Sequence, residues 1–102
     1  MIALIDRHRS ELETLCRKYH VKTLEIFGSA ADGTWDPARS DLDFLIDFLP
    51  EAASRSFHGY FDVRDELERL FQRKVDLVMP GAIRNPYFLK AVNRQREVLY
   101  AA

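Results

Sequence analysis

The stretch Asp41-Leu42-Asp43-Phe44-Leu45-Ile46-Asp47-Phe48 decides the fold class, because its side chains alternate in character with a period of two. One face would carry the apolar side chains Leu42, Phe44, Ile46 and Phe48, and the other face Asp41, Asp43, Leu45 and Asp47. This alternation predicts a strand whose first face lies in a core. On the second face, Asp41 and Asp43 would stand about 7 Å apart along the strand.

The segments on either side of this strand predict a sheet with helices. Residues 23–27 and 75–79 are short and apolar, and they end at Gly28 and at Pro80-Gly81, which favours two more strands. Apolar residues three and four apart predict amphipathic helices over residues 4–19 and 56–71. We expect a loop with one helical turn over residues 29–40, and a short helix after Pro86 followed by a last apolar piece at 98–100. The order of elements indicates an α/β (α+β) fold.

Composition narrows the classes of function. The 102 residues suffice for a single domain, 1–102. Fifteen Lys and Arg against sixteen Asp and Glu leave a net charge of −1, which argues against direct nucleic-acid binding through counterion release. The single cysteine, Cys16, excludes an internal disulfide and suits a cytoplasmic location. We expect no membrane span and no signal peptide, since apolar runs are short and a charge comes as early as Asp6.

Three short motifs carry possible chemistry. Two carboxylates on one strand face, Asp41 and Asp43, repel each other unless a cation lies between them, and Mg²⁺ prefers such oxygen ligands together with phosphates. Gly28 lets a phosphate approach the backbone, and Ser29 adds a hydroxyl and an N–H. Asp76 lies inside an apolar strand, either facing solvent or as a third member of the site. Taken singly, these motifs also fit a turn, a loop-to-strand junction and a solvated strand residue; their combination favours a site.

These residues resemble the minimal nucleotidyltransferase (MNT) family of the DNA polymerase beta superfamily. The resemblance is carried by residues 27–29 (FGS), 40–46 (SDLDFLI), 73–78 (RKVDLV) and the tail 84–100. It implies a nucleotidyltransferase fold with a small mixed sheet flanked by helices. In that family pattern Asp41, Asp43 and Asp76 would bind two Mg²⁺ ions, and Gly28 and Ser29 would hold the nucleotide triphosphate. Asp76 would also help to deprotonate an acceptor hydroxyl.

The resemblance also implies a reaction and a partner. Family members of this type are antitoxins that transfer AMP from ATP to a hydroxyl, typically of a tyrosine, on a HEPN ribonuclease toxin. We therefore expect a Mg²⁺-dependent protein adenylyltransferase in a hetero-oligomer with such a toxin. The alternative is a non-catalytic antitoxin that neutralises the toxin by occlusion. The complete set Asp41, Asp43, Asp76 and Ser29 favours the enzyme.

The sequence departs from the family pattern in two places, and other conspicuous residues have simpler interpretations. The loop between Ser29 and Asp41 is one residue longer than usual, and Asp32 stands where many relatives place a basic residue. Trp35 is expected either to pack against the core or to flank the nucleotide. Arg73-Lys74 is expected either to form a solvated helix end or to contact a phosphate. Residues expected outside the site are Asp47, Cys16, His8, His20 and His58.

Overall fold

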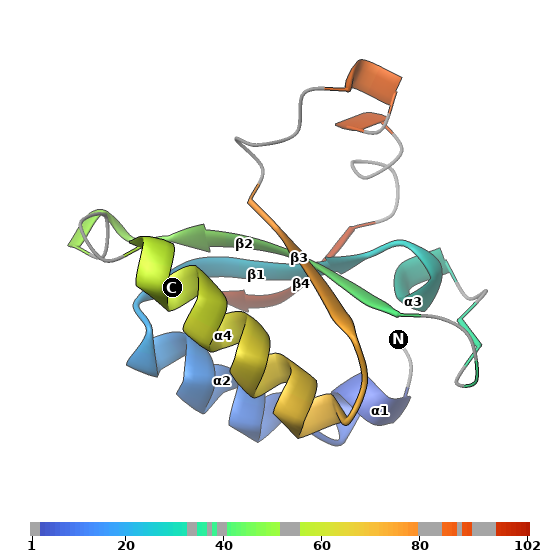
Figure 1. Cartoon of the computed structure of the whole chain (residues 1–102), viewed down its shortest axis with the longest axis horizontal. Helices are drawn as coiled ribbons and strands as arrows, with labels where there is room; N and C mark the ends of the chain where they lie inside the picture. Colours follow the sequence, from blue (N-terminus) through green and yellow to red (C-terminus); the bar gives the residue numbers. More distant parts are fainter. Residues whose placement is uncertain are drawn as a thin grey trace.

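A computed structural model describes residues 3–32, 35–36, 38, 41–51, 56–79, 85–87, 89–90 and 96–102. These residues form one sheet with helices packed along one of its faces (Figure 1). In chain order the elements are α1 (Ala3–Asp6), α2 (Arg9–Lys18), β1 (Val21–Phe27), α3 (Ser29–Asp32), β2 (Leu42–Phe48), α4 (Ser56–Phe71), β3 (Val75–Val78) and β4 (Glu97–Ala101).

The sheet is mixed, with strand order β3-β2-β1-β4. β1 pairs antiparallel with β2 and with β4, while β2 and β3 run parallel. The parallel pair needs a crossover, which α4 supplies. The predicted α/β fold with a small mixed sheet and flanking helices is confirmed, and the last apolar piece forms the edge strand β4.

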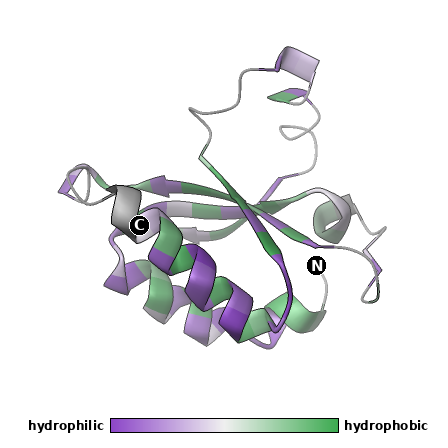
Figure 2. Cartoon of the chain, viewed as in Figure 1, coloured by the Kyte–Doolittle hydropathy of each residue, from purple (hydrophilic) through white to green (hydrophobic). Residues whose placement is uncertain are grey.

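The core lies between the sheet and the helices α2 and α4. Phe44 and Ile46 from β2 pack there with Leu24 from β1, Leu12 from α2 and Leu67 from α4, and all five are almost fully buried. Green and purple segments alternate along α2 and α4, which marks their amphipathic character (Figure 2). Among the described residues no polar or charged residue is buried. Apolar burial therefore stabilises this face of the sheet.

The first predicted helix is divided in two. The sequence predicted one helix over residues 4–19, whereas the structure has α1 and α2 separated at Arg7 and His8. The His8 N–H donates to the Ile5 carbonyl at 3.0 Å, a tighter i to i−3 bond, and its ring Nδ1 lies 2.8 Å from the Leu4 carbonyl oxygen. These local contacts satisfy the end of α1 before α2 begins at Arg9. The apolar spacing survives the break because both pieces face the same core.

Other expectations outside the site are confirmed. Cys16 is buried in the core, and burial, with Glu13 nearby, raises the pKa of its thiol to about 12. Residues 86–87 and 89–90 are helical, as expected after Pro86. In Figure 1 these tail residues stand on the side of the sheet away from α2 and α4. Within the described part of the chain, none of the helices is both long and apolar enough to span a membrane.

Candidate active site

We call the face of the sheet opposite the helices the open face; Asp43 lies on it at one end of β2, beside a small buried cluster of Phe27 and Leu45. Asp43 sits between the buried residues Leu42 and Phe44, so strand alternation turns its side chain away from the core. It pairs with Phe27 of β1 on one side and with Asp76 of β3 on the other. The first paired carboxylate is thus half-buried in the middle of three strands.

Gly28 is required beside Asp43 for two reasons. Its φ is 70°, in the left-handed region that L side chains rarely adopt. A Cβ atom at this position would also collide with Oδ2 of Asp43. The glycine therefore lets the chain turn directly from β1 into α3 while the Asp43 carboxylate lies against its backbone. Ser29 is the first residue of α3, so its position follows from that turn.

The structure brings three predicted carboxylates to the same end of the sheet. Asp76 is directly opposite Asp43 in the parallel ladder, and Asp41 immediately precedes β2. The pKa of Asp43 is raised to about 6, first by burial and then by the negative charges of Asp76 and Asp41. Asp43 is therefore the carboxylate on which burial and the neighbouring negative charges act together. Asp41 and Asp76 are themselves exposed.

Side chains of α4 hold the strand that carries Asp76. The Val75 N–H donates to Oε2 of Glu68 at 3.1 Å, and the Tyr60 hydroxyl donates to the Leu77 carbonyl. These backbone groups flank Asp76 on the outer side of the edge strand β3. Because no further strand pairs with that side in the described sheet, the two side chains satisfy the backbone groups instead. Glu68 and Tyr60 therefore fix β3 and, through it, Asp76. The sequence showed them only as members of a helix, because a contact across seven or seventeen residues leaves no local pattern.

The donor set fits a divalent cation of the Mg²⁺ type. Among the described residues no group of three or more His, Cys, Asp or Glu side chains is arranged as a closed metal cage. Mg²⁺ does not need such a cage, because it binds through one or two carboxylates and takes further oxygens from water and substrate phosphates. Burial first, and then the charges of Asp76 and Asp41, raise the pKa of Asp43, and a nearby cation would oppose both effects by favouring the ionised carboxylate.

The remaining conspicuous residues lie outside this site or support its surroundings. Trp35 packs against the core with the Arg73 guanidinium 4.7 Å from its ring centre, which supports the packing interpretation. Asp47 lies four residues further along β2, and its Oδ1 accepts a hydrogen bond from the Phe48 N–H at 3.0 Å. His20 faces Glu51 near the other end of β2. The side chain of His58 and residue Ser40 fall outside what the structure describes.

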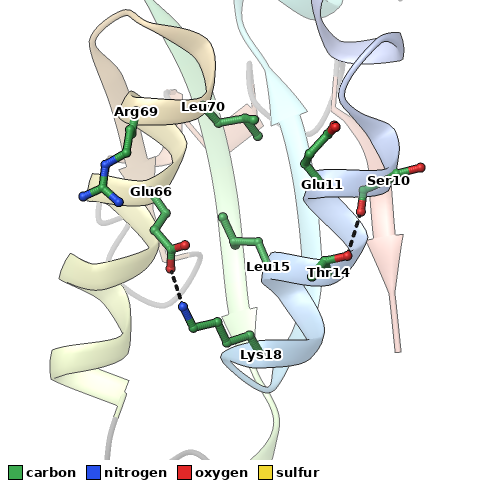
Figure 3. A pocket seen from close by; sticks show the side chains of 8 residues that line it. All are labelled: Ser10, Glu11, Thr14, Leu15, Lys18, Glu66, Arg69 and Leu70. Atoms are coloured by element: carbon green, nitrogen blue, oxygen red, sulfur yellow. Dashed lines mark hydrogen bonds and ion pairs between the residues drawn. The ribbon is translucent and has the colours of Figure 1, made fainter.

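A groove on the other side of the molecule has a different character. It lies between α2 and α4, has a volume of about 560 Å³, and is spanned by an ion pair between Lys18 and Glu66 at 3.5 Å (Figure 3). Leu15 and Leu70 point into it, together with short polar side chains from α2. Since both helices cover the face opposite Asp43, this groove is separate from the carboxylates.

Comparison with known proteins identifies the family. Residues 8–99 match the model of the nucleotidyltransferase domain. The chain is a nucleotidyltransferase of the minimal type. It is 36% identical over 95 residues to "Putative protein adenylyltransferase MJ0128" of Methanocaldococcus jannaschii, covering 93% of this chain and 91% of that protein.

Solved structures place this nucleotidyltransferase among minimal members of the family. One named "putative minimal nucleotidyltransferase" superimposes with a TM-score of 0.74 at 26% identity, covering 94% of this chain and 95% of the other. A second, the MNT antitoxin with a tri-AMPylated HEPN toxin from Shewanella oneidensis, gives a TM-score of 0.61 at 16% identity. It covers 96% of this chain and 73% of that one, and at this identity the likeness concerns the fold. The predicted family is confirmed.

Proposed function

We propose that this nucleotidyltransferase transfers AMP from ATP to a hydroxyl, most simply a tyrosine hydroxyl, of a HEPN-type toxin and so acts as its antitoxin. The observation that carries the proposal is the in-register pair Asp43 and Asp76 beside Gly28, with Asp41 next to them. Two relatives support the choice of reaction: one is named for protein adenylyltransfer, and another belongs to a complex with an AMPylated toxin.

The reaction would proceed as a displacement at the α-phosphorus of ATP. The acceptor oxygen forms a bond to this phosphorus while the bond to the oxygen bridging the α- and β-phosphates breaks. Pyrophosphate leaves with the bonding electron pair, and the hydroxyl proton passes to the carboxylate of Asp76 and then to water. Such reactions depend mainly on positioning and on electrostatic stabilisation, which a rigid sheet edge can supply.

Each site residue has a part in this scheme. Asp41, Asp43 and Asp76 would hold two Mg²⁺ ions, which would neutralise charge on the phosphates. Gly28 and Ser29 would bind the triphosphate, because the turn from β1 into α3 offers backbone N–H groups and Ser29 adds a hydroxyl. Asp43 is placed between the two other carboxylates and Gly28, so it would have contact with both the cation and the nucleotide end of the site.

The experiment that tests this function is transfer of label from α-labelled ATP to a purified HEPN partner in the presence of Mg²⁺. We expect labelling of the partner by the wild type and none by the Asp41→Ala/Asp43→Ala double variant, checked to be folded by circular dichroism. If the wild type inhibited the toxin equally with and without ATP and left it unlabelled, the result would contradict the proposal and support occlusion. Undiminished labelling by the double variant would remove the assigned residues from the reaction.

A further inference from the structure

Lys74 is a basic residue at the edge of the carboxylate cluster that has no role so far. The ladder between β2 and β3 pairs Leu42 with Val75 and Asp43 with Asp76. The Leu42 N–H also donates to the Lys74 carbonyl at 3.3 Å, so the backbone pairing reaches Lys74. If the register continues by one residue, Lys74 lies opposite Asp41, and their backbones are about 5 Å apart, the usual spacing of neighbouring strands.

The same alternation gives the face on which Lys74 stands. Val75 and Leu77 are buried against the helices, whereas Asp76 is exposed on the open face. A period of two puts Lys74 on the side of Asp76. Lys74 is exposed, and within the described residues its ammonium forms no ion pair. The backbone of Lys74 thus lies beside the carboxylate-bearing strand, on the face of Asp76, while its side chain extends into solvent.

The order of strands decides which substrate Lys74 can reach. Gly28 and Ser29 follow β1, and Asp41 and Asp43 lie on the β2 side. Asp76 belongs to the outer strand β3, which Lys74 immediately precedes. In a displacement the attacking and leaving oxygens lie on opposite sides of the phosphorus. With the triphosphate at Gly28 and Ser29 and the transferred phosphorus at Asp41 and Asp43, as proposed above, the acceptor oxygen would enter from the β3 side.

We propose that Lys74 binds the acceptor oxygen and stabilises the negative charge that this oxygen carries as Asp76 takes its proton. This inference rests on the proposed function and adds to it a residue that recognises the acceptor. The oxygen–phosphorus bond forms and pyrophosphate leaves as described above; Lys74 keeps its proton throughout and contributes charge alone. Glu68 holds the backbone next to Lys74 in place, because its carboxylate accepts a hydrogen bond from the N–H of Val75.

The test separates the acceptor from the nucleotide. The variants are Lys74→Met, which removes the charge but retains length, and Lys74→Arg, which retains the charge. Lys22→Met is the matched control, because Lys22 is exposed near the start of β1, at the end of that strand remote from Gly28. Initial rates of AMP transfer to the HEPN partner give kcat and KM for each substrate, and calorimetry gives the affinity for Mg²⁺–AMP-PNP.

We expect Lys74→Met to lower kcat/KM for the acceptor on the order of tenfold, with unchanged affinity for Mg²⁺–AMP-PNP. Lys74→Arg should restore most of the rate, and Lys22→Met should behave as the wild type. Transfer by Lys74→Met at the wild-type rate would overturn the assignment while leaving the proposed function intact. A loss of AMP-PNP affinity as large as the loss of transfer would also overturn it, because Lys74 would then serve the nucleotide. Absence of transfer by the wild type would overturn the proposed function, and this assignment with it.

Discussion

Neighbouring residues of β2 lie on opposite faces of the sheet and in opposite environments: one face is apolar and covered by helices, and the other carries charges. Phe44 is fully buried beneath the helices, where its ring stacks on Phe71 with centres 6.0 Å apart. Asp43, the preceding residue, lies half-buried on the open face against Gly28, with two like charges near it. The helix side is organised for stability, and the open face accepts a repulsion that only a bound cation or proton relieves. Substitutions on the two faces should therefore separate activity from stability.

The largest effect is expected for activity. Asp43→Ala should lower the rate of nucleotide transfer by about 10³-fold or more, because it removes a carboxylate that would hold the charge-neutralising cation. The melting temperature without ligand should not fall below that of the wild type, because the variant also loses a half-buried charge near two like charges. Initial-rate assays with labelled ATP and a thermal melt measure the two quantities. Asp47→Asn, on the same strand and face, is the control and should keep its activity; equal losses in both variants would refute the separate role of Asp43.

The core side should give the reverse result. Phe44→Ala should reduce the free energy of unfolding by about 3–5 kcal/mol, because it removes a fully buried ring and leaves a cavity. Urea unfolding followed by circular dichroism measures this loss. Val98→Ala is the control, since Val98 is 54% exposed and should change stability by less than about 1 kcal/mol. If Phe44→Ala were as stable as the control, the helix-covered face would not be the source of stability.

Gly28→Ala should affect both properties. A left-handed φ costs an L residue roughly 1–2 kcal/mol, and the new methyl group would push away the Asp43 carboxylate. We expect a lower melting temperature together with loss of transfer. Gly59→Ala provides the contrast, because Gly59 lies inside α4 and its Cβ would meet Phe48 at an ordinary 3.5 Å. That variant should gain about 0.5–1 kcal/mol. A stable, active Gly28→Ala protein would contradict the close approach of Gly28 and Asp43.

The smallest effect concerns pH. The pKa of Asp43 is raised from 3.8 to about 6 in the folded chain, so the folded state binds its proton more tightly than the unfolded state. This contribution to stability is complete below pH 3.8 and is lost as the pH rises through 6. Because the group is only half-buried, we expect about 1 kcal/mol. Asp43→Asn should be more stable than the wild type at neutral pH without Mg²⁺, in urea titrations over a pH series. A less stable Asp43→Asn would mean that the ionised carboxylate supports the fold.

Local patterns in the sequence predicted most of the sheet. The alternation over residues 41–48 gave the orientation of Asp43, and the apolar segment around Asp76 gave the outer strand. The break at Arg7 and His8 could not be seen, because the apolar spacing continues across it while a local hydrogen bond of the His8 ring ends α1. The pairing of Asp43 with Asp76 depends on register between strands 33 residues apart, which no local pattern specifies.

The site was therefore predicted as a set of residue types rather than as an arrangement. The sequence named the three carboxylates and Gly28, and the structure adds why the glycine is needed: a side chain there would meet Asp43. The support from Glu68 and Tyr60 and the register of Lys74 appear only in three dimensions. Roles of Asp41, Asp43, Asp76 and Ser29 in catalysis stay predictions for the experiments above.

The most direct test of the central claim is the mass of a HEPN partner after incubation with this nucleotidyltransferase, Mg²⁺ and ATP. The enzyme should be present in much smaller amount than the partner. We predict that the whole partner population gains the mass of one or more AMP groups, and that its ribonuclease activity stays silenced after the enzyme is removed. An unmodified partner that is inhibited only at equal amounts, with or without ATP, would contradict catalysis by the carboxylate cluster.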